Sequence, residues 1–316
     1  MRPALLLLAA AILLGACGGD GEGGDAANDG RRVVLALDFQ PNAVHAGVLA
    51  AAREGIDAGR GLALEVRAPS ASTDSLKLLL SGRADASIVD IHDLGLARER
   101  GEDVVGVGAI VQRPLAAVIA RGGVRTPSDL EGRRVGVTGL PSDDAVLDAV
   151  LESGGARPGA VERTTIGFSA VPSLAAGRLD AVVTFWSAEG VALRRRGVRT
   201  REFRVDEFGA PRYPELVLVV RRSTLDNQRE LVRDLVAVLA AGTRAALADR
   251  DAAVADVARR SGADRELVAA QLAAVAPALR PPLRLDRRQL ERWARFDVRF
   301  GIIERAPDVR RAFVTP

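Results

Sequence analysis

The chain has 316 residues, of which 48% are hydrophobic and 27% are charged, a balance typical of a globular protein and too mixed for a multi-span membrane protein. Its 44 basic and 41 acidic side chains nearly cancel, and the longest basic run, Arg194 to Arg196, is short, so we expect no nucleic-acid binding. A single cysteine excludes an internal disulfide framework and any cysteine-based metal site.

The N-terminus has the pattern of a secretion signal. Arg2 precedes an apolar stretch over 4–14, which is shorter than the roughly 20 residues needed to span a bilayer. The segment Leu14-Gly15-Ala16-Cys17 then resembles a bacterial lipobox, in which the cysteine thiol takes a diacylglycerol. We predict a signal peptide over 1–16, a lipid anchor on Cys17 and a flexible linker over 17–31. The alternative is an ordinary cleaved signal with an incidental cysteine.

The body of the chain alternates short strands and helices, and it does so twice. The first half predicts strands over 33–39, 62–68 and 86–89, with helices over 43–54 and 73–80. The second half repeats this order, with strands over 134–137, 163–166 and 181–185 and helices over 142–153 and 172–176. The pattern Gly-Arg-x-Asp-Ala occurs at 82–86 and again at 177–181, where a helix ends at glycine and aspartate opens a buried strand. Strands separated by helices imply parallel pairing through right-handed crossovers.

Two further apolar strands are expected at 115–120 and 216–221, between the halves and after the second half. We interpret them as crossing segments that form a hinge, the later one returning the chain to the first lobe. Helices follow over 231–244, 251–261, 264–276 and 286–300. We expect lobe 1 to comprise 32–120 and 214–316 and lobe 2 to comprise 121–213, with a cleft between them.

This architecture resembles the two-lobed substrate-binding proteins of ABC importers. The doubled Gly-Arg-x-Asp-Ala, the segment 127–137 and Gly301-Ile302-Ile303 carry the resemblance. It implies an α/β fold of the type II periplasmic-binding-protein class, in which each lobe is an open, mostly parallel sheet flanked by helices.

The segment 37–47, Leu-Asp-Phe-Gln-Pro-Asn-Ala-Val-His-Ala-Gly, resembles more narrowly the proteins that bind thiamine pyrimidine precursors. Those relatives usually read Asp-Trp-x-Pro-Asn-x-x-His-x-Gly, so Phe39 replaces a tryptophan but keeps an aromatic face. The resemblance implies ligand contacts from Asp38, Phe39, Asn42 and His45. From the residues alone, Asn42 could equally cap the helix, and His45 could be a packing or capping residue.

The other candidate ligand residues follow predicted strands, where open α/β sheets bind ligands. Asp90 and His92 could face the cleft or form a buried pair that only shapes the loop. Ser72 could bind the ligand or cap the next helix. Trp186 would cover a flat ring and Glu189 would accept from an exocyclic amine, or they could be a core residue and a first-turn acid.

No catalytic motif is found, so we expect a binding protein and not an enzyme, with no cofactor and no bound metal. The pyrimidine synthases of similar fold carry a cysteine-rich iron-binding run, and this chain has no cysteine after Cys17. We predict a monomeric, extracytoplasmic lipoprotein of an ABC importer, working with a permease and an ATPase. Its ligand would be a hydroxymethylpyrimidine- or formylaminopyrimidine-type heterocycle held between Phe39 and Trp186.

Several alternatives remain open at this point. The same protein could bind riboflavin, or a sulfonate- or nitrate-type anion, for which Arg113 near the hinge is a candidate partner. It could also be a pyrimidine-synthase-like enzyme, or a lipoprotein whose lobes act as a sensor.

Overall fold

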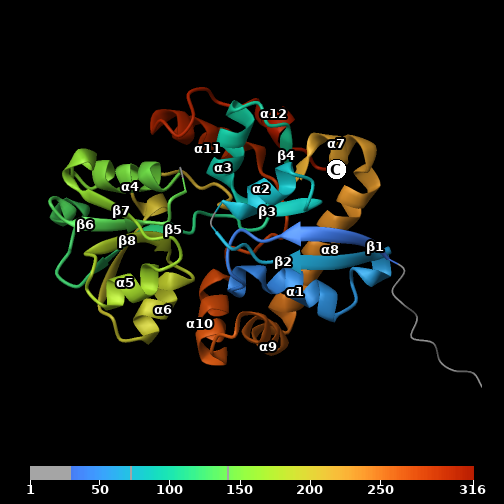
Figure 1. Cartoon of the computed structure of the whole chain (residues 1–316), viewed down its shortest axis with the longest axis horizontal. Helices are drawn as coiled ribbons and strands as arrows, with labels where there is room; N and C mark the ends of the chain where they lie inside the picture. The colour runs from blue at the N-terminus through green and yellow to red at the C-terminus, as the bar shows by residue number, and fades with distance from the viewer. Residues whose placement is uncertain (1–29, 72, 141) are drawn as a thin grey trace, which may run out of the picture.

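The computed structural model describes residues 30–71, 73–140 and 142–316, which form two lobes side by side (Figure 1). The predicted signal peptide, Cys17, nearly all of the linker and Ser72 lie outside the described residues. In spatial order, the sheet of the first lobe contains β2 (Leu62–Arg67), β1 (Arg31–Ala36), β3 (Ala86–Asp90), β10 (Leu216–Arg221) and β4 (Val104–Ala109). The sheet of the second lobe contains β7 (Glu162–Thr165), β6 (Arg134–Val137), β8 (Ala181–Phe185), β5 (Ala116–Arg121) and β9 (Thr200–Arg204).

Helices cover both faces of the sheets. Those of the first lobe are α1 (Ala46–Arg53), α2 (Asp74–Leu80), α3 (Ile91–Glu99), α7 (Arg222–Asn227), α8 (Arg229–Ala248), α9 (Arg250–Ser261), α10 (Arg265–Val275), α11 (Arg287–Arg299) and α12 (Val309–Ala312). Those of the second lobe are α4 (Ser142–Ser153), α5 (Ala170–Ala175) and α6 (Glu189–Arg195). None of the helices within the described ranges is long and apolar enough to cross a membrane.

The two sheets share one topology, which confirms the predicted two-lobed α/β fold. In each sheet four strands point one way and one strand is reversed, β10 in the first sheet and β5 in the second. The reversed strand has the corresponding place in both sheets: β10 lies between β3 and β4, and β5 lies between β8 and β9. The central strands of the first sheet are buried on both sides. Ile88 and Leu218 pack toward α8, whereas Val89 and Val217 pack toward α3 and α11.

The doubled sequence pattern forms the same hydrogen bonds in both lobes. The Asp85 carboxylate accepts from the Val34 N–H at 2.8 Å, and the Asp180 carboxylate accepts from the Arg134 N–H at 3.1 Å. Asp85 thereby joins the start of β3 to β1 in the first lobe, and Asp180 joins the start of β8 to β6 in the second lobe. The sequence repeat therefore has a structural cause, because it fixes the register at which two parallel strands meet.

An arginine ends each reversed strand and performs the same task twice. The Arg221 guanidinium donates to the Ala84 carbonyl at 2.8 Å and to the Leu79 carbonyl at the end of α2. The Arg121 guanidinium donates to the Leu174 carbonyl in the last turn of α5 at 3.4 Å. Carbonyls at a helix end lack partners within the helix, so these arginines satisfy them and tie the reversed strand to its lobe.

The crossings between the lobes lie over 110–115 and 205–215, and this corrects the predicted hinge. The apolar segments at 115–120 and 216–221 belong almost entirely to β5 and β10, which are interior strands of the two sheets. β10 returns the chain to the first sheet as expected. However, β5 pairs with β8 and β9 of the second sheet, so the boundary predicted after residue 120 falls before Ala116. The segment is apolar because strands flank it on both sides.

Helix α8 packs closely against α1, and two glycines make this possible. A Cβ atom on Gly47, the last residue of the segment 37–47, would lie 2.8 Å from the Cα of Thr243. A Cβ atom on Gly242 would lie 2.2 Å from the carbonyl oxygen of Gly47. The glycine of the motif is therefore explained by backbone contact between helices.

We predict that Gly242→Ala destabilises the protein by about 1 to 3 kcal/mol, because the added methyl group overpacks this contact. The free-energy cost of overpacking should exceed the roughly 1 kcal/mol by which alanine stabilises a helix relative to glycine. The measurement is the urea unfolding midpoint. Gly59→Ala is the matched control, because a Cβ atom there would have no neighbour within 4 Å. Equal midpoints for the two variants would contradict the packing argument.

Candidate ligand site between the lobes

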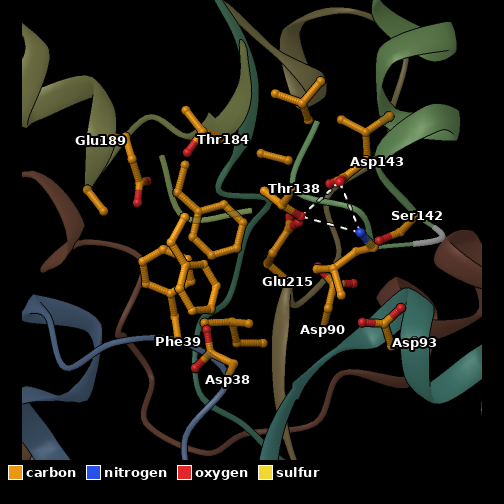
Figure 2. Close-up of a pocket in the computed structure, with 18 of the residues that line it drawn as sticks. Asp38, Phe39, Asp90, Asp93, Thr138, Ser142, Asp143, Thr184, Glu189 and Glu215 are labelled. Carbon is orange, nitrogen blue, oxygen red and sulfur yellow. Dashed lines mark hydrogen bonds between the residues drawn. The ribbon is translucent and has the colours of Figure 1, made fainter. Parts of the chain in front are cut away.

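A pocket of about 790 Å³, its open mouth included, lies between the two lobes (Figure 2). It lies at the carboxyl ends of β1, β3, β6 and β8, the position at which open α/β sheets bind ligands. Five of the predicted ligand residues line it, namely Asp38, Phe39, Asn42, Asp90 and Glu189. His45, His92 and Trp186 do not line it.

The segment 37–47 forms a loop that holds Asp38 and Phe39 at the pocket. The Asn42 side chain accepts from the Val44 N–H at 3.0 Å and donates to the Gln40 carbonyl at 3.1 Å. Asn42 therefore caps the short 3-10 helix η1 (Ala43–His45), which confirms the capping role, and it also lines the pocket, where its ligand contact stays a prediction.

His45 supports this loop from behind and is fully buried. Its Nδ1 accepts from the Asn42 N–H at 3.2 Å, and its Nε2 lies 2.8 Å from the Asp38 carboxylate. Because Nδ1 accepts a hydrogen bond, the imidazole proton is on Nε2, and the Nε2–H group donates a hydrogen bond to the Asp38 carboxylate. The predicted ligand contact from His45 is corrected to a positioning role, because the ring nitrogens are already bound to the loop.

Three phenylalanines from different segments form the aromatic wall. Phe39 follows β1 of the first lobe, whereas Phe168 and Phe185 belong to the second lobe. The rings of Phe39 and Phe168 meet across the cleft edge to face, with centroids 4.4 Å apart. Phe168 and Phe185 were not selected as ligand residues from the sequence. Phe185 stands directly before Trp186 at the end of a predicted strand, and this aromatic pair was a signal for Phe185.

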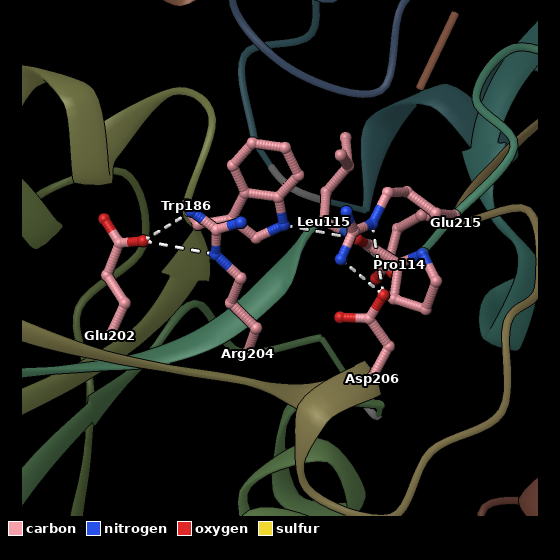
Figure 3. Close-up of polar contacts among 8 residues, drawn as sticks. Pro114, Leu115, Trp186, Glu202, Arg204, Asp206 and Glu215 are labelled. Atoms are coloured by element: carbon pink, nitrogen blue, oxygen red, sulfur yellow. Dashed lines mark hydrogen bonds and ion pairs between the residues drawn. The ribbon is translucent and has the colours of Figure 1, made fainter. Parts of the chain in front are cut away.

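Trp186 is corrected from a ligand contact to a hinge residue (Figure 3). Its indole N–H donates to the Pro114 carbonyl at 3.2 Å, and the Arg204 guanidinium lies 4.2 Å from its ring centroid. Only 4% of its surface is exposed. Phe185 ends β8, and successive side chains of a strand point to opposite sides, so Phe185 takes the pocket side and Trp186 takes the hinge side.

Carboxyl groups dominate the polar lining. Six of them reach the pocket, those of Asp38, Asp90, Asp93, Asp143, Glu189 and Glu215. Among the described lining residues there is no arginine, lysine or histidine. Burial raises the pKa of Glu189 above its ordinary value, and burial raises the pKa of Asp93 to about 7. The pocket therefore offers hydrogen-bond acceptors, several of which retain a proton more readily than a surface carboxyl does.

Glu215 connects the pocket to the hinge. Its carboxylate accepts from the Leu115 N–H at 2.9 Å, which joins the two crossings between the lobes. Burial raises the pKa of Glu215 to about 7, and burial also raises the pKa of the adjacent Asp90. Asp90 caps α3 by accepting from the His92 N–H at 2.9 Å. Glu215 was missed because it follows a loop of the second lobe and precedes a strand of the first.

His92 lies behind this pair and does not reach the pocket, which corrects its predicted ligand contact. Its Nδ1 lies 2.7 Å from the Asp297 carboxylate and its Nε2 lies 3.1 Å from the Tyr213 hydroxyl. Burial lowers the pKa of His92, but the neighbouring carboxyls, Asp297 first and then Asp90 and Asp93, together raise it to about 9. Possible metal ligand atoms of Asp90, His92 and Glu215 lie within 4.8 Å of one another. However, both ring nitrogens of His92 have protein partners, so this cluster is built as a hydrogen-bond network.

Together, the duplicated α/β lobes and the pocket between them define a two-lobed binding protein of the periplasmic type. A family model described as NMT1/THI5 like matches residues 42–253, and the chain belongs to this family.

Known relatives include both a binding protein and enzymes. A formylaminopyrimidine-binding protein of Halalkalibacterium halodurans is 33% identical over 244 residues, 76% of this chain and 71% of the relative. A 4-amino-5-hydroxymethyl-2-methylpyrimidine phosphate synthase of Legionella pneumophila is 23% identical over 207 residues, 64% of this chain and 65% of the relative. The fold is shared with the periplasmic aliphatic sulphonate binding protein SsuA of Escherichia coli, with a TM-score of 0.73 at 16% identity over 90% of this chain and 92% of that one.

We predict that Asp93→Asn stabilises the protein at pH 8 but not at pH 4. Because the pKa of Asp93 is raised to about 7, the folded state holds this proton more tightly than the unfolded state, whose aspartate has a pKa near 4. The stability that this proton contributes is fully present below about pH 4 and is lost as the pH rises through about 7. Asparagine cannot ionise, so it avoids the loss.

The expected gain at pH 8 is on the order of 1 kcal/mol, or about 2 to 4 °C in Tm, measured by thermal unfolding at both pH values. Asp226→Asn, at an exposed aspartate of α7, is the control. A Tm difference for Asp93→Asn that is the same at pH 4 and pH 8 would show that the carboxyl does not titrate as argued.

Proposed function

We propose that this chain is the extracytoplasmic solute-binding protein of an ABC importer and that its pocket binds an aminopyrimidine of the thiamine-precursor type. Hydroxymethylpyrimidine and formylaminopyrimidine are the candidate ligands. The observation that carries the proposal is the lining of the pocket, which combines three phenylalanine rings with six carboxyl groups and has no basic side chain among its described residues. The name of the 33% identical relative supports the same class of ligand.

An aminopyrimidine matches this lining chemically. Its flat ring presents an apolar face to the phenylalanines, and its exocyclic amine donates two hydrogen bonds that carboxylates accept. Asp38 and Glu189 come from opposite lobes, and the charge of Asp38 adds to the burial that raises the pKa of Glu189. A donor group between these two carboxyls would offset their repulsion and so favour closure of the lobes on the ligand.

The lining argues against the other ligands considered. A sulfonate or nitrate needs cationic or N–H partners, and Arg113, the residue that kept this option open, pairs with Asp206 at 2.7 Å in the hinge. The ring of riboflavin presents a single N–H among several acceptors, so its edge fits carboxyls less well than the edge of an aminopyrimidine does, and only the hydroxyls of its ribityl chain would supply further donors. The absence of cysteine after Cys17 argues against an enzyme of the iron-binding synthase type.

Calorimetry tests the ligand class directly. Purified protein should bind hydroxymethylpyrimidine or formylaminopyrimidine, and neither nitrate nor an alkanesulfonate. Phe39→Ala should weaken binding by about 1 to 3 kcal/mol through loss of stacking surface, and Glu189→Gln by about 1 kcal/mol through loss of a charge-assisted hydrogen bond. Phe300→Ala, at a phenylalanine outside the pocket lining, is the control and should leave Kd unchanged.

Two results would count against the proposal. Binding of the sulfonate alone, unaffected by Phe39→Ala, would overturn the aminopyrimidine. Binding of riboflavin alone, weakened by Phe39→Ala, would keep the pocket and replace the ligand.

We further propose that Cys17 carries a lipid that anchors the protein, as a monomer, to the outer face of the cytoplasmic membrane, where it delivers its ligand to a permease driven by an ATPase. The lipobox-like segment and the position of the only cysteine support this. Wild-type protein should fractionate with membranes, and Cys17→Ala should fractionate with soluble proteins if the leader is still removed. One acyl chain binds membranes only weakly, whereas the two chains of a diacylglycerol give stable anchoring. Wild-type protein that carries a diacylglycerol should therefore stay with the membranes during a salt wash. Identical fractionation of the two proteins would refute the anchor.

A further inference from the structure

One end of the pocket contains a carboxylate that occupies an anion-binding position. The loop after β6 leads into α4, and Asp143 lies in the first turn of this helix. One oxygen of its carboxylate accepts from the Thr138 hydroxyl at 2.8 Å (Figure 2). The same oxygen accepts from the Gly139 N–H at 2.9 Å and from the Leu140 N–H at 3.2 Å. Backbone N–H groups between a strand and a helix form the common site for a phosphate. Here the protein's own side chain takes these donors.

A second carboxyl faces this end from the other lobe. Asp93 lies in the first turn of α3 and lines the same pocket. Its Oδ1 is buried and has no hydrogen-bond partner among the described residues. Burial raises the pKa of Asp93, and the charge of Asp143 adds to this effect. Two cations act in the opposite direction, His92 more strongly than Arg100, and neither of them lines the pocket: both ring nitrogens of His92 are bound to Asp297 and Tyr213 behind it, and Arg100 is exposed.

This end lies opposite the carboxyls proposed to bind the ligand amine. Figure 2 shows Asp143 and Asp93 on one side of the pocket and Glu189 and Asp38 on the other. A pyrimidine whose amine faces Glu189 would therefore direct a substituent from its far edge toward Asp143 and Asp93. The loop N–H groups at Gly139 and Leu140 and the Thr138 hydroxyl already donate to Asp143, so none of these three donors is free for the substituent.

We infer that Asp143 and Asp93 determine specificity by accepting a hydroxyl or amide donor on the ligand's substituent and excluding its phosphate ester. The inference rests on the proposed pyrimidine-binding function. A phosphate monoester carries about two negative charges near neutral pH and would meet two carboxyls, with no cation among the described residues that line the pocket to contact it. The distinction is relevant within this family, because one relative is named for formylaminopyrimidine and others for synthesis of a pyrimidine phosphate.

The test compares hydroxymethylpyrimidine with its phosphate monoester by calorimetry at pH 8 on the whole purified protein. Wild-type protein should bind the alcohol at least about 100-fold more tightly than the ester. Asp93→Asn should narrow this ratio about tenfold by improving ester binding. Asp143→Asn should narrow the ratio of alcohol to ester affinity as well. Because Asp143 also holds the loop, this variant could fail to fold, and Asp93→Asn then provides the test.

Asp148→Asn is the matched control, since Asp148 is an α4 carboxylate that pairs with Arg163 outside the pocket lining. It removes the same charge from the protein and should leave the ratio unchanged. Equal or tighter ester binding by wild-type protein would overturn the inference while leaving the pyrimidine function in place. A ratio that Asp148→Asn narrows as much as Asp93→Asn would overturn the assignment to this end of the pocket. Binding of none of hydroxymethylpyrimidine, its phosphate ester and formylaminopyrimidine would overturn the proposed function and this inference together.

Discussion

The hydrogen bond from the Leu115 N–H to the Glu215 carboxyl joins the two crossings at the floor of the pocket, and the surrounding structure is arranged around it. Trp186 packs over the same place and donates to the Pro114 carbonyl, while Arg113 and Asp206 form an ion pair that links the crossings again. Figure 3 shows how closely these groups gather. Glu215 belongs both to the hinge and to the floor of the pocket, so the geometry that sets the angle between the lobes also positions a carboxyl at the ligand site. Motion of the lobes and the chemistry of the pocket cannot be separated here.

The fold could be read from the sequence where local pattern decides structure. Helix α4 and strands β6 and β8 fall on the expected residues because their apolar periodicity is regular and glycine, proline or aspartate marks their ends. Strand β4 was not predicted because its glycines weaken the pattern. The structure explains them, since a Cβ atom on Gly106 would lie 2.5 Å from the Phe313 ring and one on Gly108 would lie 2.5 Å from Leu283. Both neighbours are far away in the sequence, so no local signal reports them.

The site shows the same division. Position in the chain, just after a predicted strand, selected Asp90 and Glu189 as pocket residues, and the resemblance of the segment 37–47 selected Asp38. The sequence did not indicate in which direction each side chain points. For this reason two residues of rare types, His92 and Trp186, were wrongly predicted to contact the ligand. His92 is held by Asp297 and Tyr213, and Trp186 by Pro114, partners that lie more than seventy positions away. Those partners turn both side chains away from the ligand site and leave common residues, phenylalanine and aspartate, to line it.

The position of the two reversed strands has a consequence for how the molecule is assembled. Counted along the chain, β1 to β5 form one unit of five strands and β6 to β10 form a second, yet β5 completes the sheet of the second unit and β10 completes that of the first. Each half has exchanged its fifth strand with the other, as subunits do in a swapped dimer. Arg121 and Arg221 fasten each donated strand into its host. A chain cut between the units would therefore leave two incomplete sheets, and the two lobes, although they enclose a cleft, are obligate partners in folding.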